Sequence, residues 1–169
     1  MELKTDEDIS AYYRGLLIQN TIDIELRMEI IIGKFISMNN QERTMDMIEI
    51  FDFAIMDFFS KIKILKYIVK KYIPNFLNRV DIPRIDASLL FTDLTYIMEK
   101  RNKLAHKKPD LESYNRLKIT WNVTDNYNII RKEIKLTSEF REEYLDKCAN
   151  SYVALIYLEV EVMQWAKNS

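Results

Sequence analysis

The stretch DASLLFTDLTYIMEKRNKLAHK, residues 86–107, predicts one helix of the fold and contains the residues that suggest a function. Leu90, Leu94 and Ile97 recur at steps of four and three, the spacing that forms one apolar stripe on a helix. Arg101 occupies the next position of this stripe. We therefore expect its guanidinium to face another surface, where it needs a hydrogen-bond acceptor or water.

The chain has a single histidine, His106, close to the expected end of this helix. On a continuing helix His106 shares a face with Asn102, four residues earlier, while Arg101 is turned away from both. Pro109 disfavours helical geometry at the residue before it, so the helix should end within about one turn of His106. The long Arg101 side chain and His106 can then converge at the helix end.

The motif of Arg101, Asn102 and His106 resembles the signature of the HEPN superfamily. In that superfamily an Arg, a polar residue that is often Asn, and a His four to six residues later lie in an all-helical domain. Many members are metal-independent ribonucleases whose site forms at a dimer interface. The resemblance implies that these three residues are catalytic and that the chain is an endoribonuclease, for example a toxin or a phage-defence effector.

The same resemblance implies partners for the chain. These are an RNA substrate, a second copy of the chain, and an antitoxin or regulatory protein. Some HEPN toxins carry a tyrosine two residues after the histidine, and Lys108 occupies that position here. Silencing by modification of such a tyrosine is therefore not expected of this chain.

The residue types of the motif suit cleavage of RNA without a metal ion. The histidine pKa lies near neutrality, which suits the proton transfers, and the arginine fork donates two hydrogen bonds to phosphate oxygens. The asparagine amide can orient the histidine or a phosphate oxygen. One histidine cannot easily act as base and acid in a single step. We therefore expect a homodimer in which a two-fold axis brings two copies of the motif together.

The composition is that of an ordinary folded protein, with 169 residues, of which 48% are apolar and 30% charged. We expect one domain, residues 1–169. The net charge of −1 gives no general attraction to nucleic acid, so RNA binding must depend on a local basic patch. The expected patch lies beside Arg101 and consists of Lys100, Lys103, Lys107 and Lys108.

Several classes of protein do not fit the sequence. The single Cys148 cannot form an internal disulfide, and with one histidine it gives no metal-ligand spacing, so neither a metal nor a cofactor is expected. We expect Cys148 to be a small apolar residue inside a helix. The absence of an apolar leader or a membrane-length run predicts a cytoplasmic protein that does not bind membranes.

The remaining patterns predict a mainly α fold, a HEPN-like bundle of four to five helices with a small β-hairpin inserted at about residues 118–136. The alternation of Ile119, Trp121 and Val123 with polar residues indicates the first strand. The first and last helices should be long enough to pack side by side. Helices are expected over residues 5–35, 60–72 and 86–107 and from 138 to near the end, with an irregular, partly helical region at 44–59 and a loop at 74–86.

The helix expected over residues 60–72, with Ser60 as its N-cap, contains Lys61, Lys63, Lys66, Lys70 and Lys71. These lysines form either a solvated face or an RNA-binding face.

Two other interpretations of the whole chain stay open from the sequence. It is a non-catalytic HEPN-like dimerisation or interaction module, or it binds nucleotides or nucleic acid without turnover. In the simplest structural interpretation, His106 caps the end of its helix and Arg101 pairs with an acidic residue.

Overall fold

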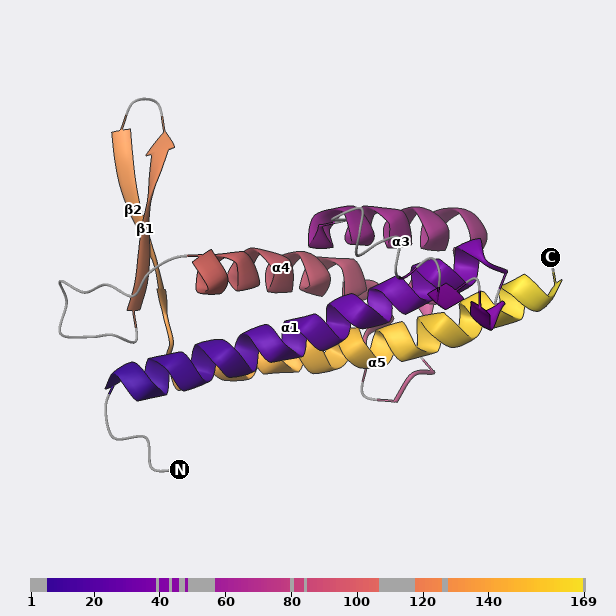
Figure 1. The fold of residues 1–169 in the computed structure, drawn as a ribbon, viewed down its shortest axis with the longest axis horizontal. Helices are drawn as coiled ribbons and strands as arrows, with labels where there is room; N and C mark the ends of the chain where they lie inside the picture. Colours follow the sequence, from indigo (N-terminus) through magenta and orange to yellow (C-terminus); the bar gives the residue numbers. More distant parts are fainter. Residues whose placement is uncertain are drawn as a thin grey trace.

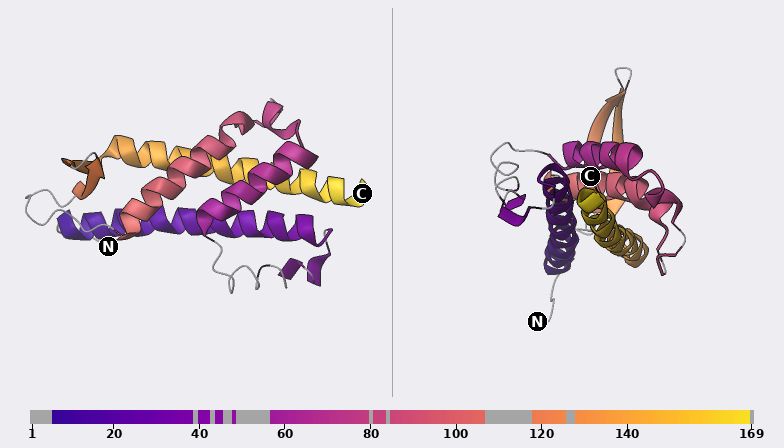
Figure 2. Two further views of the ribbon diagram at one scale, coloured as in Figure 1. Left: turned by 90° about the horizontal axis from the view of Figure 1, so that it is seen from above. Right: turned by 90° about the vertical axis from the view of Figure 1, so that its right-hand side faces the viewer.

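Helices in two layers form the fold (Figures 1 and 2). The structure is a computed structural model, and it describes residues 6–38, 40–42, 44–45, 48, 57–79, 81–83, 85–106, 118–125 and 128–168. For residues 6, 7, 9, 10, 118–125 and 128–132 it describes the main chain alone. The α-helices of the described part are α1 (Asp6–Ile36), α3 (Phe58–Tyr72), α4 (Leu90–His106) and α5 (Ser138–Asn168). The expected mainly α bundle is confirmed.

The lower layer consists of α1 and α5, which are each 31 residues long and run side by side in the same direction (Figure 1). Their predicted apolar stripes face inward, and the stripe residues of α1 include the fully buried Leu17 and Met28. The hydroxyls of Thr21 and Tyr144 share a buried hydrogen bond of 2.7 Å between the two helices. Further along, Arg27 and Lys34 of α1 both pair with Glu159 of α5, each at 2.6 Å.

The upper layer consists of α3 and α4, which cross over the lower layer (Figure 2). On α3 the residues Ile62, Leu65 and Val69 are buried, as their spacing predicts. Lys61 is buried beside them and pairs with Glu25 and Glu29 of α1. The expectation that all five lysines of this helix lie on one solvated or RNA-binding face is therefore wrong for Lys61. A buried ammonium needs charged partners, and α1 supplies them.

The helix starts follow from their capping side chains. Asp57, not Ser60, is the N-cap of α3, because its carboxylate accepts a hydrogen bond from the main-chain N–H of Ser60. Asp86 caps a short 3₁₀ turn, η2 (Ala87–Leu89), that leads into α4. The hydroxyl of Thr137 accepts a hydrogen bond from the N–H of Phe140 at the start of α5.

The segment expected as a loop over residues 74–86 is more ordered than its sequence indicates. It contains a second 3₁₀ turn, η1 (Phe76–Asn78), and buries Phe76 and Ile82 in the core. Two buried apolar side chains anchor this connection, which proline at position 74 still separates from α3. The partly helical region expected over residues 44–59 lies largely outside the described residues.

A two-stranded antiparallel sheet, β1 (Lys118–Asp125) and β2 (Asn128–Lys135), forms the expected hairpin. It stands beside the end of α4 and projects away from the lower layer (Figure 1). The register pairs Ile119 with Ile134 and Val123 with Ile130, so apolar residues oppose each other across the strands. Ile134 and the following Leu136 are buried and join the base of the hairpin to the core.

Candidate functional site

The helix α4 carries the motif of Arg101, Asn102 and His106 in its last two turns. Leu90 and Leu94 of its stripe are fully buried, as are Ile97 and Leu104. Arg101 lies on the same side of the helix as these residues and is only partly exposed. The expectation that this arginine points to where the helix faces another surface is confirmed.

The guanidinium of Arg101 has one buried edge. Its Nε atom is buried and has no hydrogen-bond partner among the described residues. Burial raises the pKa of the Tyr144 hydroxyl, while its hydrogen bond with Thr21 and the nearby positive charge of Arg101 act in the opposite direction. The described part of the chain offers Arg101 no carboxylate, so the expected pairing with an acidic residue is not seen there. A buried, unpaired guanidinium atom favours an external acceptor or water.

Asn102 and His106 lie on the outer face of α4 and are both exposed. One terminal nitrogen of Arg101, Nη1, donates a hydrogen bond of 3.2 Å to Oδ1 of Asn102. His106 is the last residue of α4, and the residues that follow it lie outside the described part of the chain, so the expected end of the helix within a turn of His106 stays a prediction. Within the described part of the chain His106 has no hydrogen bond, so the structure joins Arg101 to Asn102 and not to His106.

The end of α4 is held by a contact that the sequence did not reveal. Arg14 of α1 donates two hydrogen bonds to the main-chain oxygen of Leu104, from Nε at 3.0 Å and from Nη2 at 2.5 Å. This oxygen belongs to the last turn of the helix, where carbonyls lack a partner within the helix. Arg14 and Leu104 are 90 residues apart in the chain, so no local pattern indicates the contact.

A second arginine from a neighbouring helix lies at the same end of the bundle. Arg141 of α5 stands over the ring of Tyr13, the residue before Arg14, with 4.1 Å between its guanidinium carbon and the ring centre. Its Nε is also buried without a hydrogen-bond partner among the described residues. Three helices thus each bring one arginine, Arg14, Arg101 and Arg141, to the end of the bundle that carries the motif. Such a gathering of fixed positive charge suits an anion.

The expected basic patch is described only in part. Lys100 lies over the ring of Tyr96 with 5.0 Å between its ammonium nitrogen and the ring centre. Lys103 is partly buried. Lys107 and Lys108 lie outside the described residues, so their expected role in RNA binding stays a prediction.

Asp93 is a second charged residue of α4 that faces the interior, and it was not predicted from the sequence. It is 3% exposed and accepts hydrogen bonds from Lys147 at 3.0 Å and from Asn150 at 2.9 Å. Burial raises the pKa of the nearby Cys148 thiol to about 12, and the negative charge of Asp93 adds to this effect. Cys148 is buried, as expected, and its thiol is held in the neutral, unreactive form.

The described residues do not suggest a metal centre, because no three His, Cys, Asp or Glu side chains among them gather as ligands would. None of the described helices has the length and apolar character that crossing a membrane requires. The chain matches no family model, no curated protein and no solved structure. The site is therefore interpreted from its own residues and their geometry.

Proposed function

We propose that the protein is a metal-independent endoribonuclease of HEPN type, with Arg101, Asn102 and His106 as its catalytic residues. The observation that carries this proposal is the placement of Arg101, whose guanidinium has a buried Nε without a hydrogen-bond partner among the described residues and an Nη1 that donates to the exposed Asn102. A fixed cation thus lies beside an exposed amide, and an exposed histidine follows one turn later on the same helix. These are the groups that phosphodiester cleavage by acid–base catalysis requires.

In the proposed reaction the ribose 2′-oxygen attacks the adjacent phosphorus, and the bond from phosphorus to the 5′-oxygen breaks. A neutral His106 accepts the proton of the 2′-hydroxyl, and an imidazolium donates a proton to the departing 5′-oxygen. Arg101 stabilises the extra negative charge on the phosphorane oxygens, and Asn102 orients Arg101 or the phosphate. The products are a 2′,3′-cyclic phosphate and a 5′-hydroxyl end.

The need for a base and an acid supports a homodimer as the active form. The outer face of α4 presents Asn102 and His106 to solvent. A two-fold axis beside this face places two copies of the motif in one cleft, so that one His106 acts as base and the other as acid. In this arrangement, dilution to the monomer abolishes cleavage in parallel with dissociation.

The test is cleavage of total RNA in EDTA by the wild-type protein, by His106→Ala and by Arg101→Ala, with analysis of the product ends. Thr92→Ala, an exposed substitution on the same helix, is the matched control. We expect the wild type and Thr92→Ala to leave 2′,3′-cyclic phosphates and the two motif variants to be inactive while still folded and equally oligomeric. Equal cleavage by wild type and His106→Ala would contradict the proposal.

We also propose that such an activity serves a toxin or phage-defence role in which an antitoxin or regulatory protein silences it. The exposed position of His106 supports this, because a partner that covers the end of α4 blocks the site directly. Co-expression with the products of neighbouring genes, followed by the same cleavage assay, tests the idea. The proposal is supported if the protein product of a neighbouring gene binds this protein and suppresses its cleavage of RNA, and contradicted if none does.

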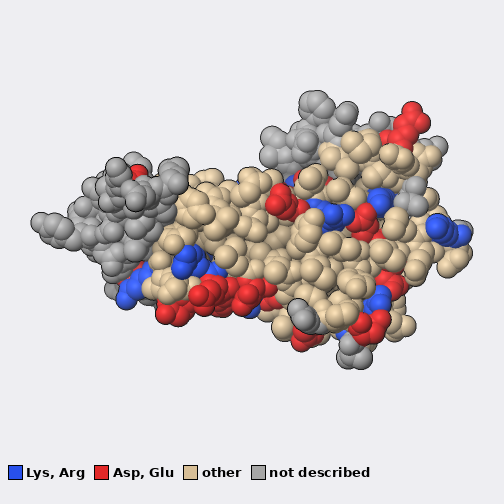
Figure 3. Space-filling model, turned by 90° about the horizontal axis from the view of Figure 1, so that it is seen from below, with Lys and Arg blue, Asp and Glu red and all other residues tan. Residues whose placement is uncertain are grey.

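A second candidate function is a non-catalytic HEPN-like dimerisation or interaction module, and a specific surface favours it. Seen from below, much of the surface is uncharged, while acidic residues group along part of one border and both acidic and basic residues lie near the middle (Figure 3). The exposed apolar side chains of α1 and α5 include Ile22 and Leu26, at 46% and 49%, and Ile156 and Val160, at 37% and 40%. Exposed apolar side chains contribute to an interface where they lie together in one patch.

The two candidates differ in which face the protein uses. Leu26→Lys and Ile156→Lys should dissociate a dimer that forms through the lower layer, which sedimentation at micromolar concentration measures. A protein that forms this dimer and does not cut RNA in EDTA is the interaction module. A protein that cuts RNA and keeps cutting it after these substitutions uses another face for its active assembly.

A further inference from the structure

The outer face of α3 has a charge pattern that the motif does not explain. The helix contains five lysines and no acidic residue. Lys61 is neutralised by Glu25 and Glu29, and the other four, Lys63, Lys66, Lys70 and Lys71, are exposed. Four lysines in about three turns of helix give a strongly positive strip on a chain whose net charge is −1.

Aromatic side chains are interleaved with these lysines. Phe59 is 44% exposed and Tyr67 is 57% exposed, although burial of such rings is strongly favourable. The ammonium of Lys63 lies 4.2 Å from the ring centre of Phe59, and that of Lys71 lies 5.4 Å from the ring centre of Tyr67. Exposed rings that alternate with lysines offer flat faces and positive charge on one surface.

One of these aromatic residues and three of the lysines lie on a single side of α3. Phe59, Lys63, Lys66 and Lys70 are separated by four, three and four residues, which places them in one row about 16 Å long. Tyr67 borders this row. We call these five residues the α3 row.

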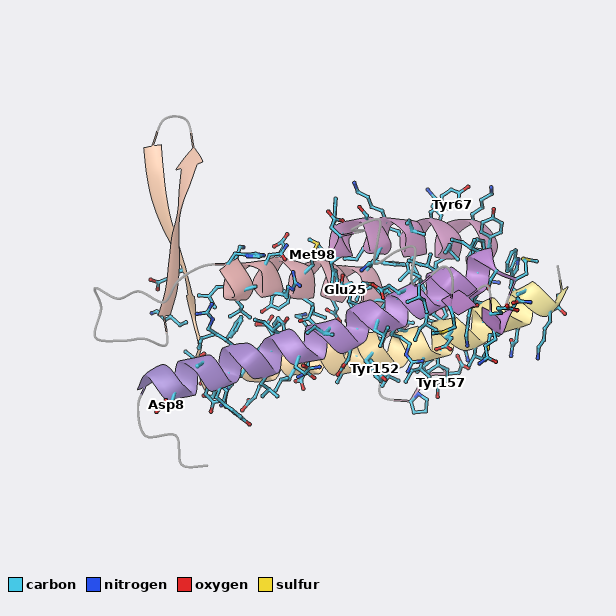
Figure 4. The ribbon with its side chains drawn as sticks, in the orientation of Figure 1. Asp8, Glu25, Tyr67, Met98, Tyr152 and Tyr157 are labelled. Atoms are coloured by element: carbon cyan, nitrogen blue, oxygen red, sulfur yellow. The ribbon has the colours of Figure 1, made fainter. Side chains whose placement is uncertain are left out.

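The α3 row and the motif lie in the same layer. Tyr67 on α3 and Met98 on α4 both lie on the side of their helices that faces away from α1 and α5 (Figure 4). Asn102 follows Met98 by four residues and therefore continues the same face of α4 toward His106. A single extended strand that lies along the upper layer can therefore contact both.

We propose that the α3 row binds single-stranded RNA, with bases stacked on Phe59 and Tyr67 and phosphates paired with Lys63, Lys66 and Lys70. The choice of RNA rests on the proposed ribonuclease function, for which the row is a substrate-binding surface remote from the reacting bond. The chemistry is that of sequence-independent strand binding, in which stacking platforms alternate with cations that follow the backbone. The absence of any acidic residue from α3 favours a polyanion over a protein partner of mixed charge.

The test measures binding apart from cleavage, by fluorescence anisotropy of a labelled single-stranded RNA of about 20 nucleotides with the His106→Ala protein. In that background Lys66→Gln with Lys70→Gln is compared with Lys135→Gln with Lys167→Gln, which removes two exposed lysines elsewhere. Tyr67→Leu is compared with Tyr12→Leu, a similarly exposed tyrosine on α1. Leucine retains apolar bulk but removes the flat ring.

We expect each α3 variant to bind RNA about tenfold more weakly than its control. The lysine pair should also lower the slope of log affinity against log salt by about 1.4, since each phosphate contact on a single strand contributes about 0.7. Equal affinity of the α3 variants and their controls overturns the proposal, as does binding of the His106→Ala protein to phosphatidylserine vesicles but not to RNA.

The outcome for the α3 row is independent of the outcome for the motif. If the wild type does not cleave RNA but the α3 variants lose binding, the ribonuclease proposal fails and the RNA-binding surface stands. If the wild type cleaves RNA in EDTA and the α3 variants bind as their controls do, the motif stands and the α3 row has no role in RNA binding.

Discussion

Arg14 of α1 caps the last described turn of α4 by donating hydrogen bonds from Nε and Nη2 to the main-chain oxygen of Leu104. The accepting residue is two positions before His106. One charged side chain from the first helix therefore holds the last described turn of the motif helix.

Arg14→Met should loosen this turn, because the carbonyl of Leu104 loses both donors while the apolar stem of the side chain is largely retained. Hydrogen bonds from a charged donor contribute about 1.5–3 kcal/mol, so we expect a loss of about 2 kcal/mol in the free energy of unfolding. Urea denaturation measures the loss, and amide hydrogen exchange localises it to residues 102–106. Arg14→Lys should recover part of the free energy of unfolding and part of the protection of these amides from exchange. Unchanged exchange in this turn would show that Arg14 does not hold it.

Asp93→Ala should destabilise the packing of α4 on α5. The carboxylate is buried with Lys147 and Asn150 as its donors, and its removal leaves two polar groups without their acceptor. Lys147 is 28% exposed and can turn to water, so we expect a loss of about 2 kcal/mol, below the 3–5 kcal/mol that is typical of a fully buried pair. Asp93→Asn keeps an acceptor for Asn150 and should cost about half as much in urea denaturation. An equal loss of stability in both variants would mean that Asp93 stabilises the protein through its negative charge and not through its hydrogen bond with Asn150.

Lys61→Met should destabilise the protein by about 3 kcal/mol, because Glu29 stays buried without its cation. Burial alone would lower the pKa of Lys61, but hydrogen bonds and charge from Glu25 and Glu29 outweigh it and raise the pKa, so the lysine is charged in the folded protein. The double variant Lys61→Met with Glu29→Leu replaces the pair by apolar side chains and should recover most of the loss. Failure of the double variant to recover stability would indicate that Glu25 carries the interaction.

The stability of the fold should decrease between pH 9 and pH 12. Burial raises the pKa of Cys148 from its ordinary 9.0 to about 12, and burial together with Glu143 raises that of Tyr96 from 10.0 to about 12. In this range the unfolded chain has lost protons that the folded chain keeps, so rising pH favours unfolding.

Cys148→Ala should flatten the stability curve between pH 9 and pH 10, where the thiol is the first of these groups to contribute. Urea denaturation at a series of pH values measures this effect. The native thiol should also react with Ellman's reagent at pH 8 far more slowly than the thiol of the urea-unfolded chain. Rapid labelling of the native protein would show that Cys148 is accessible.

The sequence predicted those parts of the fold that depend on local periodicity. The four-three spacing identified the buried sides of α1, α4 and α5, because an amphipathic helix has only one side that it can bury favourably. It also placed Arg101 on the same side of α4 as the buried stripe residues. The alternating residues of β1 were equally informative, since a strand repeats every two residues.

Contacts between distant helices could not be predicted in this way. Lys61 was assigned to a solvated or RNA-binding face because its partners, Glu25 and Glu29, lie on another helix. Asp93 carried a usable signal, since it falls three residues after Leu90 and four before Ile97, inside an apolar stripe. A carboxylate at such a position needs a buried partner, although nothing local indicates that Lys147 and Asn150 provide it.

The parallel arrangement of α1 and α5 has a consequence for how the chain folds. Thr21 and Tyr144, which bond across the two helices, are 123 residues apart in the chain, and Arg27 and Glu159 are 132 apart. At a synthesis rate of about 5–20 residues per second, the ribosome needs roughly 6–25 s to make the partner of α1 after α1 itself has emerged. Although α3 and α4 become available sooner, the interface along the lower layer forms only near the end of synthesis. Folding should therefore be slow for a helical protein, and during this interval α1 exposes an apolar surface that chaperones can bind.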